Sequence, residues 1–395
     1  MRIGVLRERY PGECRVAVVP SLIELYRKLG HEVVIEAGAG AGAFFPDRAY
    51  EEAGARILPS REAVFAESDL LLAVRTAGAN PTLFADDLPL FREGQILIGF
   101  VEPLFRPQYV AQLAERGVSV FAMELIPRIT RAQNMDALSS MATVAGYKAV
   151  LLAGSLLPSM FPLLMTAAGT ISPARVFVIG AGVAGLQAMA TAKRLGAAVE
   201  GYDVRPATRD QVESVGAKFI EIPLEVQQAE ASGGYARALE EETLRRQQQL
   251  LGEHLIRQEV IITTAAVPGK RAPLLIPQSV VEQMRPGTVI IDLTAEYGGN
   301  CELTPSDPDH PERIFGLPVR YYRDVVIVGA MNLPATVPSD ASLLYARNLY
   351  NLVAHLSKVT MLPTPDPNHE DAIANETLVT HGGQVVNARV ASALG

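Results

Sequence analysis

The sequence contains no tryptophan, only two cysteines, and no histidine between His31 and His254. Neither Cys14 nor Cys301 has a metal-ligand neighbour at useful spacing, so a metal-stapled or disulfide-stapled domain is excluded and a reducing, intracellular setting is indicated. The chain also lacks a His-x-x-x-His pair, a serine or cysteine nucleophile elbow and a Walker loop. These absences exclude the commonest metalloenzyme, hydrolase and P-loop classes.

Positive charge is scarce and spread out. The formal net charge is −8 and no Lys/Arg-rich run occurs, which argues against a nucleic-acid partner and against an anionic membrane surface. The chain starts directly in an apolar strand pattern, so no signal or transit peptide is expected.

Residues 149–174 carry no charge, which raises the question of a transmembrane helix. Glycine and proline break this stretch into pieces shorter than a span, so a buried helix between domains followed by a loop fits better than a membrane span.

The length of 395 residues, with 49% hydrophobic and 20% charged residues, indicates two packed α/β domains. Short apolar strand patterns alternate with helical ones towards the N-terminus, which predicts a parallel sheet with helical crossovers. The expected strands there are Arg2–Arg7, Glu32–Glu36, Leu70–Val74, Gln95–Val101 and Val118–Leu125. We expect two Rossmann-like, doubly wound parallel-sheet domains joined by long helices, comprising residues 1–131 plus 335–395 and residues 132–334.

The most informative stretch runs from Arg175 to Asp203. A short apolar strand ends at G-x-G-x-x-G, with Gly180 for the tight turn, Gly182 for close backbone approach to a diphosphate and Gly185 for helix–strand packing. Asp203 follows the next strand, about 20 residues on, where such folds place the acid that binds the adenosine ribose. The pattern predicts a dinucleotide site on a helix N-terminus.

Asp203 favours NAD(H), because a carboxylate repels a 2′-phosphate. Arg205 is the opposing signal, since an arginine nearby can hold that phosphate. We give the acid more weight.

A polar loop precedes the long helix at the expected domain crossing. In it, Arg128 and Asp136 can pair, Gln133 can bridge riboses and Ser139 can meet a carboxamide. The simpler alternatives are a surface charge, a solvated glutamine and an aspartate that caps the helix. The residues alone leave both interpretations open.

The lack of a candidate proton carrier also limits the reactions that the chain could catalyse. Oxidising an alcohol or amine requires a proton carrier, normally His or Lys, and the sequence offers no obvious candidate. Hydride exchange between two nicotinamide rings needs none, only two rings held roughly 3–3.5 Å apart in a dry site.

Several long motifs resemble the NAD(H)-binding first domain of proton-translocating nicotinamide nucleotide transhydrogenases. They are PRITRAQNMDALSS, GAGVAG with YDVRP, SGGYA, TTAAVPGKRAPLL, IDLTAEYGGNCELT and NLPATVPSDASLLYARNL. The resemblance implies that the loop carrying Arg128, Gln133, Asp136 and Ser139 serves hydride transfer, with Gln133 reaching towards the NADP(H) of a partner. The nucleotide contacts that it implies are Val183, Asp203, Val204, Arg205, Gly234 and Val267, with Tyr235 on a loop that closes over the nucleotide.

The resemblance further implies a Re/Si-specific transhydrogenase that is active only with partner subunits. We expect a homodimeric, peripheral NAD(H)-binding subunit on the cytoplasmic face of the inner membrane, with NADP(H)-binding and membrane-spanning domains on other chains.

Alanine dehydrogenase is the related alternative. Arg15 matches its substrate arginine, but its lysine and histidine fall on Arg75 and Val101, and its late aspartate falls on Glu296. Without the proton-transferring pair, amino-acid oxidation lacks chemical support. A non-catalytic NAD-binding regulator is a third alternative.

Overall fold

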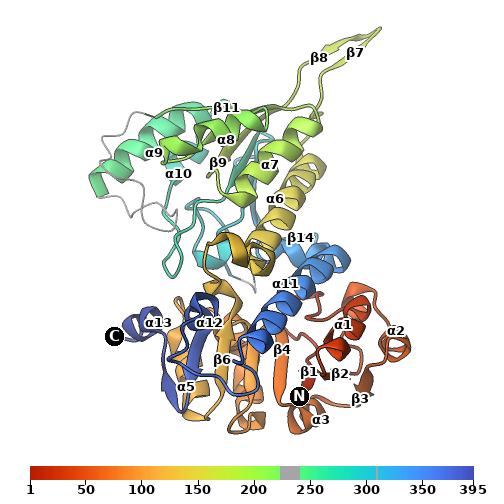
Figure 1. The fold of residues 1–395 in the computed structure, drawn as a ribbon. Coiled ribbons are helices and arrows are strands. Elements are labelled where there is room, and N and C mark those ends of the chain that lie inside the picture. The colour runs from red at the N-terminus through yellow and green to blue at the C-terminus, as the bar shows by residue number, and fades with distance from the viewer. Residues whose placement is uncertain (223–240, 308–309) are drawn as a thin grey trace. The chain divides into compact units, whose positions relative to one another are not determined.

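The computed structural model describes residues 1–222, 241–307 and 310–395, which form two compact units. Unit 1 comprises residues 1–141 and 335–395, and unit 2 comprises residues 142–334. Each unit is a sheet with helices on both faces (Figure 1). The predicted pair of Rossmann-like domains is therefore confirmed.

The described residues of unit 1 form an eight-stranded sheet in the order β18-β17-β6-β5-β4-β1-β2-β3. The six consecutive strands from β6 to β3 pair in parallel, and β17 and β18 add an antiparallel edge. The strands are β1 (Arg2–Val5), β2 (Glu32–Glu36), β3 (Arg56–Leu58), β4 (Leu70–Arg75), β5 (Ile96–Phe100), β6 (Ser119–Ala122), β17 (Leu378–His381) and β18 (Gln384–Val385).

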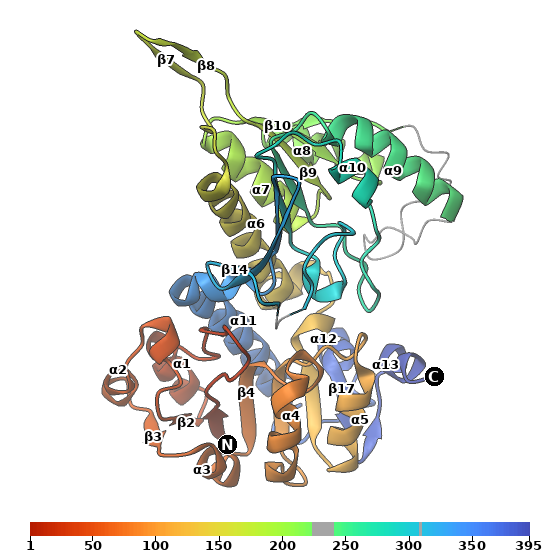
Figure 2. The same ribbon diagram turned by 180° about the vertical axis from the view of Figure 1, so that it is seen from behind.

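The helices of unit 1 cover both faces of this sheet, with α11 towards the viewer in Figure 1 and α4 and α5 towards the viewer in Figure 2. They are α1 (Ile23–Lys28), α2 (Asp47–Glu52), α3 (Arg61–Glu67), α4 (Pro81–Asp87), α5 (Pro107–Glu115), α11 (Pro338–Lys358), α12 (Ala372–Thr377) and α13 (Ala388–Ala393). The Tyr345 hydroxyl of α11 donates to the Ala73 carbonyl of β4 at 2.9 Å, which ties the longest helix to the middle of the sheet.

The described residues of unit 2 form a second eight-stranded sheet, in the order β11-β10-β9-β12-β13-β16-β15-β14. Strands β11 to β16 in this order are parallel, whereas β15 and β14 add an antiparallel edge that the sequence did not predict. The strands are β9 (Arg175–Ile179), β10 (Ala198–Tyr202), β11 (Lys218–Phe219), β12 (Val260–Thr263), β13 (Val289–Asp292), β14 (Arg313–Ile314), β15 (Leu317–Tyr322) and β16 (Val325–Gly329).

Alternate residues of the central strands of unit 2 enter different cores, because successive side chains of a strand point to opposite faces. Val176 and Val178 pack with α6 (Ala137–Leu156) and α7 (Val183–Arg194), and α8 (Arg209–Ser214) lies on the same face. Phe177 and Ile179 pack on the other face, against α9 (Glu241–Leu255) and α10 (Gln278–Val281). Nearly continuous apolar strands are buried on both faces in this way.

Among the described helices, α6 is long and apolar enough to cross a membrane by length and composition. Its Ala149, Val150 and Ala153 are instead fully buried in the core of unit 2. The helix ends at Leu156, just before Pro158, as the helix breakers predicted.

A feature not predicted follows α6. The short strands β7 (Leu164–Thr166) and β8 (Gly169–Ile171) form a hairpin that extends away from the body of unit 2 (Figures 1 and 2).

Candidate functional site

The glycine-rich turn lies at the carboxyl end of β9, on the edge of the sheet where open α/β folds bind ligands. Gly180 has a φ of +98°, which an L side chain rarely adopts. A Cβ on Gly185 would lie 1.8 Å from the Gly180 carbonyl oxygen, so only glycine allows α7 to start this close to β9. The turn has the geometry expected of a dinucleotide motif.

The start of α7 faces open space. Gly182 is the N-cap of this helix, and a Cβ built on it would meet no atom within 4 Å. Val183, the first helical residue, is 40% exposed. The first N–H groups of a helix lack acceptors within the helix, and the macrodipole adds positive potential there. An anionic diphosphate fits this position.

Asp203 follows β10 and lies beside the turn. The Ala181 N–H donates to its Oδ2 at 2.7 Å, so the carboxylate is linked directly to the glycine turn. The Asp203 side chain is only 7% exposed and is paired with Arg205 at 2.9 Å. Val204 packs against the core on the α9 face.

Val267 lies after the next strand of the sheet, β12, and is half-buried. Two residues whose roles the sequence analysis did not assign frame this edge. Thr264 donates from Oγ1 to the Gly180 carbonyl at 3.2 Å, and Asn300 both accepts from the Ala265 N–H at 3.1 Å and donates to the Ala265 carbonyl at 2.8 Å. Both lie in motifs that carried the resemblance, which was the signal available to find them.

The residues of unit 2 therefore fit a dinucleotide. The observation that carries this fit is the open space in front of Gly182 beside a buried carboxylate. The predicted contacts Gly234 and Tyr235 lie outside the described residues.

The predicted hydride-transfer loop belongs to unit 1. Arg128 and Gln133 are exposed, and Gln133 lies in the 3-10 helix Thr130–Met135. Asp136 accepts from the Ser139 N–H at 2.9 Å and from the Ser139 hydroxyl at 2.6 Å. The carboxylate of Asp136 thus caps α6, which was the simpler of the two interpretations of this residue.

The residues compared with alanine dehydrogenase also lie in unit 1. The guanidinium of Arg15 binds the Glu13 carboxylate at 2.8 and 2.6 Å, and both side chains are nearly fully buried. The Arg75 guanidinium stacks over the Tyr10 ring at 4.1 Å, and Val101 is fully buried. An internal carboxylate therefore already neutralises the arginine that would have to hold an amino acid.

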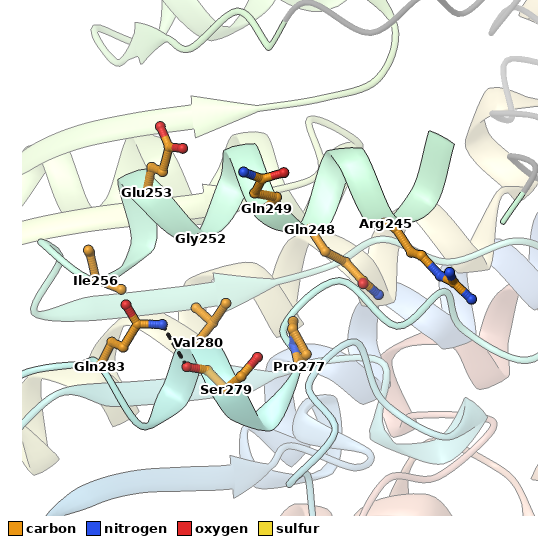
Figure 3. Close-up of a pocket in the computed structure, with 10 residues that line it drawn as sticks. All are labelled: Arg245, Gln248, Gln249, Gly252, Glu253, Ile256, Pro277, Ser279, Val280 and Gln283. Carbon is orange, nitrogen blue, oxygen red and sulfur yellow. Dashed lines mark hydrogen bonds between the residues drawn. The ribbon is translucent and has the colours of Figure 1, made fainter. Parts of the chain in front are cut away.

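A cavity of about 370 Å³ lies between α9 and α10 in unit 2 (Figure 3). Its lining is rich in amide side chains, including Gln248, Gln249 and Gln283, and Gln283 Nε2 donates to the Ser279 carbonyl at 2.8 Å. The cavity contains none of the predicted site residues. The described residues also contain no cluster of three or more His, Cys, Asp or Glu side chains that could hold a metal ion.

The fold and the glycine turn define a two-domain α/β protein with a Rossmann domain of the dinucleotide-binding type. Family models described as "Alanine dehydrogenase/PNT, N-terminal domain" and "Alanine dehydrogenase/PNT, C-terminal domain" match residues 4–145 and 149–388. The chain therefore belongs to the alanine dehydrogenase/PNT family, within its group of NAD(P) transhydrogenase alpha subunits.

Individual relatives support this placement. The chain is 43% identical over 392 residues to the first of the polypeptides that make up the NAD(P) transhydrogenase alpha subunit of Rhodospirillum rubrum, with 98% of each covered. It is 29% identical over 405 residues to the alanine dehydrogenase of Mycobacterium tuberculosis, with 100% of this chain and 97% of the relative covered. The crystal structure of a transhydrogenase from Sinorhizobium meliloti matches with a TM-score of 0.80 and 37% identity, over 98% of this chain and 99% of that one. The predicted family is confirmed.

Proposed function

We propose that this chain is the NAD(H)-binding peripheral subunit of a proton-translocating, Re/Si-specific transhydrogenase. The observation that carries the proposal is the carboxyl edge of the sheet in unit 2, where the open N-terminus of α7 lies beside Asp203. When bound, NADH supplies a hydride to NADP⁺ held by a partner chain. The residues of this chain bind, orient and shield the reacting nucleotide.

In unit 2, Gly180, Gly182 and Gly185 shape the turn for the diphosphate, and Val183 starts the helix whose N–H groups bind it. Asp203, Val204 and Arg205 hold the adenosine ribose, and Val267 lines the same edge. We assign Gly234 and Tyr235 to the nucleotide by resemblance alone.

In unit 1, Arg128 and Asp136 serve the nicotinamide end, with Ser139 beside Asp136, and Gln133 reaches towards the NADP(H) of the partner. Asp136 is already oriented by its two bonds from Ser139. A capping role does not conflict with this proposal, because a capped aspartate is a rigid one.

Alanine dehydrogenase activity is disfavoured. Arg15 is paired with Glu13, and a buried valine stands where that family has its histidine. No acid or base is needed for hydride exchange between two nicotinamides, since no proton moves.

The identity of the partner chains is also a proposal. The relative from Rhodospirillum rubrum is named as one portion of a subunit and has nearly the same extent as this chain. We propose that NADP(H)-binding and membrane-spanning chains complete the enzyme on the cytoplasmic face of the inner membrane, and that the membrane chain couples hydride transfer to proton translocation.

We further propose that the chain is a homodimer, with the β7–β8 hairpin as its contact. Met165 is 76% exposed and Leu163 is 54% exposed, and residues 149–174 carry no charge. An uncharged two-stranded arm with open edges invites pairing with another chain.

Mixing the purified chain with an NADP(H)-binding partner chain tests the function. We expect hydride exchange between NADH and an oxidised nicotinamide analogue of NADP⁺ only when both chains are present. Pyruvate, ammonia and NADH without the partner test the rival, and sustained NADH consumption there would favour alanine dehydrogenase.

A further inference from the structure

One backbone carbonyl of the hydride-transfer loop is held from two positions on α11. The Asn134 carbonyl oxygen accepts a hydrogen bond from Asn348 Nδ2 and another from Asn351 Nδ2, each at 2.9 Å. Both asparagines are in unit 1, and they lie three residues apart on the same face of the helix. The Asn134 carbonyl belongs to the peptide between Asn134 and Met135, so the two bonds hold the backbone one residue after the proposed hydride-transfer glutamine, Gln133.

The side-chain amide of Asn348 is buried but only partly hydrogen-bonded. It is 6% exposed, and among the described residues its Oδ1 is buried without a hydrogen-bond partner. Burying an unsatisfied amide oxygen costs stability, so an apolar leucine with the same side-chain branching would suit this position better for folding alone. The amide is therefore better explained by what its Nδ2 holds than by a contribution to the core.

An ion pair also holds the same loop. Arg131 Nη1 donates to Asp371 Oδ2 at 2.9 Å, and His355 of α11 meets Asp371 Oδ1 at 2.9 Å. Although burial raises the pKa of Asp371, the hydrogen bond from His355 and the N–H of Ala374 lower it to about 2. Asp371 is therefore an anion throughout the working pH range. It gives Arg131 a fixed partner, although the Arg131 side chain is half-exposed and contributes little on its own.

Two buried apolar residues also hold this loop in place. Ala132 and Met135 are buried on the two sides of Gln133 and Asn134, which are both exposed. The loop thus has buried residues and hydrogen bonds on both sides of the exposed side chain of Gln133. This arrangement restricts the backbone of Gln133 while leaving its amide available.

We propose that Asn348 and Asn351 are positioning residues for hydride transfer, which fix the backbone at Gln133 and Asn134 through the Asn134 carbonyl. This inference depends on the function proposed above for the loop. Hydride transfer demands that reacting atoms be held near contact, and a displacement of about 1 Å can cost about 100-fold in rate. Losing both donors should therefore slow transfer by at least about 10-fold.

The test uses the full chain mixed with its NADP(H)-binding partner. Asn348→Leu combined with Asn351→Leu removes both donors and keeps the number and branching of side-chain heavy atoms, and Arg347→Ala on the exposed side of the same helix is the control. We expect single-turnover hydride transfer to fall at least about 10-fold in the double variant, with the Kd for NADH within about twofold of wild type. We also expect the Tm to change little, since the removal of a buried unsatisfied oxygen offsets the loss of the two hydrogen bonds.

Hydrogen exchange provides a readout without any nucleotide. Amides of residues 129–136 should exchange faster in the double variant than in wild type or Arg347→Ala, whereas those of β9 should not change. Asn351→Gln in place of Asn351→Leu should restore some of the rate, because it returns one donor. An unchanged transfer rate in the double variant, or a loss of rate matched by a lower Tm and weaker NADH binding, would overturn the inference. If wild type itself transfers no hydride, the proposed function fails instead.

Discussion

Arg205 contacts both oxygens of Asp203: its backbone N–H and Nε each donate to Oδ1 at 2.9 Å, and its Nη2 donates to Oδ2 at 3.1 Å. With the Ala181 N–H also on Oδ2, the lone pairs of the carboxylate are fully used. A ribose diol must therefore displace at least one guanidinium contact. The arginine that the sequence suggested as a phosphate ligand is instead the partner of the acid.

The pairing of Asp203 with Arg205 predicts that the chain prefers NADH to NADPH. NADH should bind well ahead of NADPH in a calorimetric titration. Asp203→Ser should weaken NADH binding and improve NADPH binding, because it frees Arg205 for a 2′-phosphate. We expect the ratio of the two Kd values to shift at least about 10-fold, equivalent to about 1.4 kcal/mol. Asp210→Ser, at an exposed carboxylate on α8, is the control and should leave the ratio unchanged. Equal affinities of wild type for the two nucleotides would contradict the role given to Asp203.

Gln133 is predicted to act in transfer and not in NADH binding. Gln133→Asn shortens the side chain by one methylene, so hydride exchange in the reconstituted complex should fall about 10-fold while the Kd for NADH stays within about twofold. The matched control is Gln108→Asn, an exposed glutamine on α5. Unaffected turnover in Gln133→Asn would mean that the loop is only structural.

The buried carboxyl group of Glu124 should make the stability of the fold depend on pH. Its Oε1 accepts from the N–H groups of Val101 and Glu102 at 2.6 and 2.7 Å, while its Oε2 is buried with no hydrogen-bond partner among the described residues. Burial raises the pKa of Glu124 from 4.5 to about 7, against the lowering effect of these backbone bonds. The folded chain therefore binds this proton more tightly than the unfolded chain, and stability is lost as pH rises from about 4.5 through 7.

Glu124→Gln keeps an oxygen for both backbone donors and cannot ionise. Between pH 5 and pH 8, wild type should lose on the order of 2 kcal/mol more unfolding free energy than this variant. Denaturant titrations at the two pH values measure the difference. The same pH dependence in both proteins would show that Glu124 is ionised throughout.

The exposed apolar β7–β8 hairpin predicts that the chain forms a homodimer through this hairpin. Leu163→Asp with Met165→Asp places charge on the exposed arm and should convert a dimer to a monomer, as measured by light scattering after size-exclusion chromatography. Phe315→Asp, at another exposed apolar residue of unit 2, should leave the mass unchanged. A double variant that remains dimeric would move the contact elsewhere on the chain.

The regular elements of the fold were predictable because they are periodic. Strand Glu32–Glu36 has the predicted bounds, and the strand predicted from Leu70 to Val74 ends one residue later, at Arg75. The β7–β8 hairpin was missed because each strand has three residues, too few for an alternating pattern to show.

The details of the site were less predictable. The glycine turn and Asp203 are close in sequence, so local spacing carried most of the information. Asp136 had two plausible partners, and only the structure places its carboxylate on Ser139. Asn348 and Asn351 are more than 200 residues from Asn134, at separations of 214 and 217, and a lone asparagine on a helix gives no pattern that could indicate such contacts.

The central claim is that hydrogen passes directly between nicotinamide rings without a protein acid or base. The most direct measurement is to mix NADH deuterated at the transferred C4 position with this chain, its NADP(H)-binding partner and NADP⁺, and to follow the label by mass spectrometry. The account predicts that the deuterium appears at C4 of NADPH with no loss to water. Label that washes into the solvent, or solvent deuterium that enters NADPH during transfer, would contradict it.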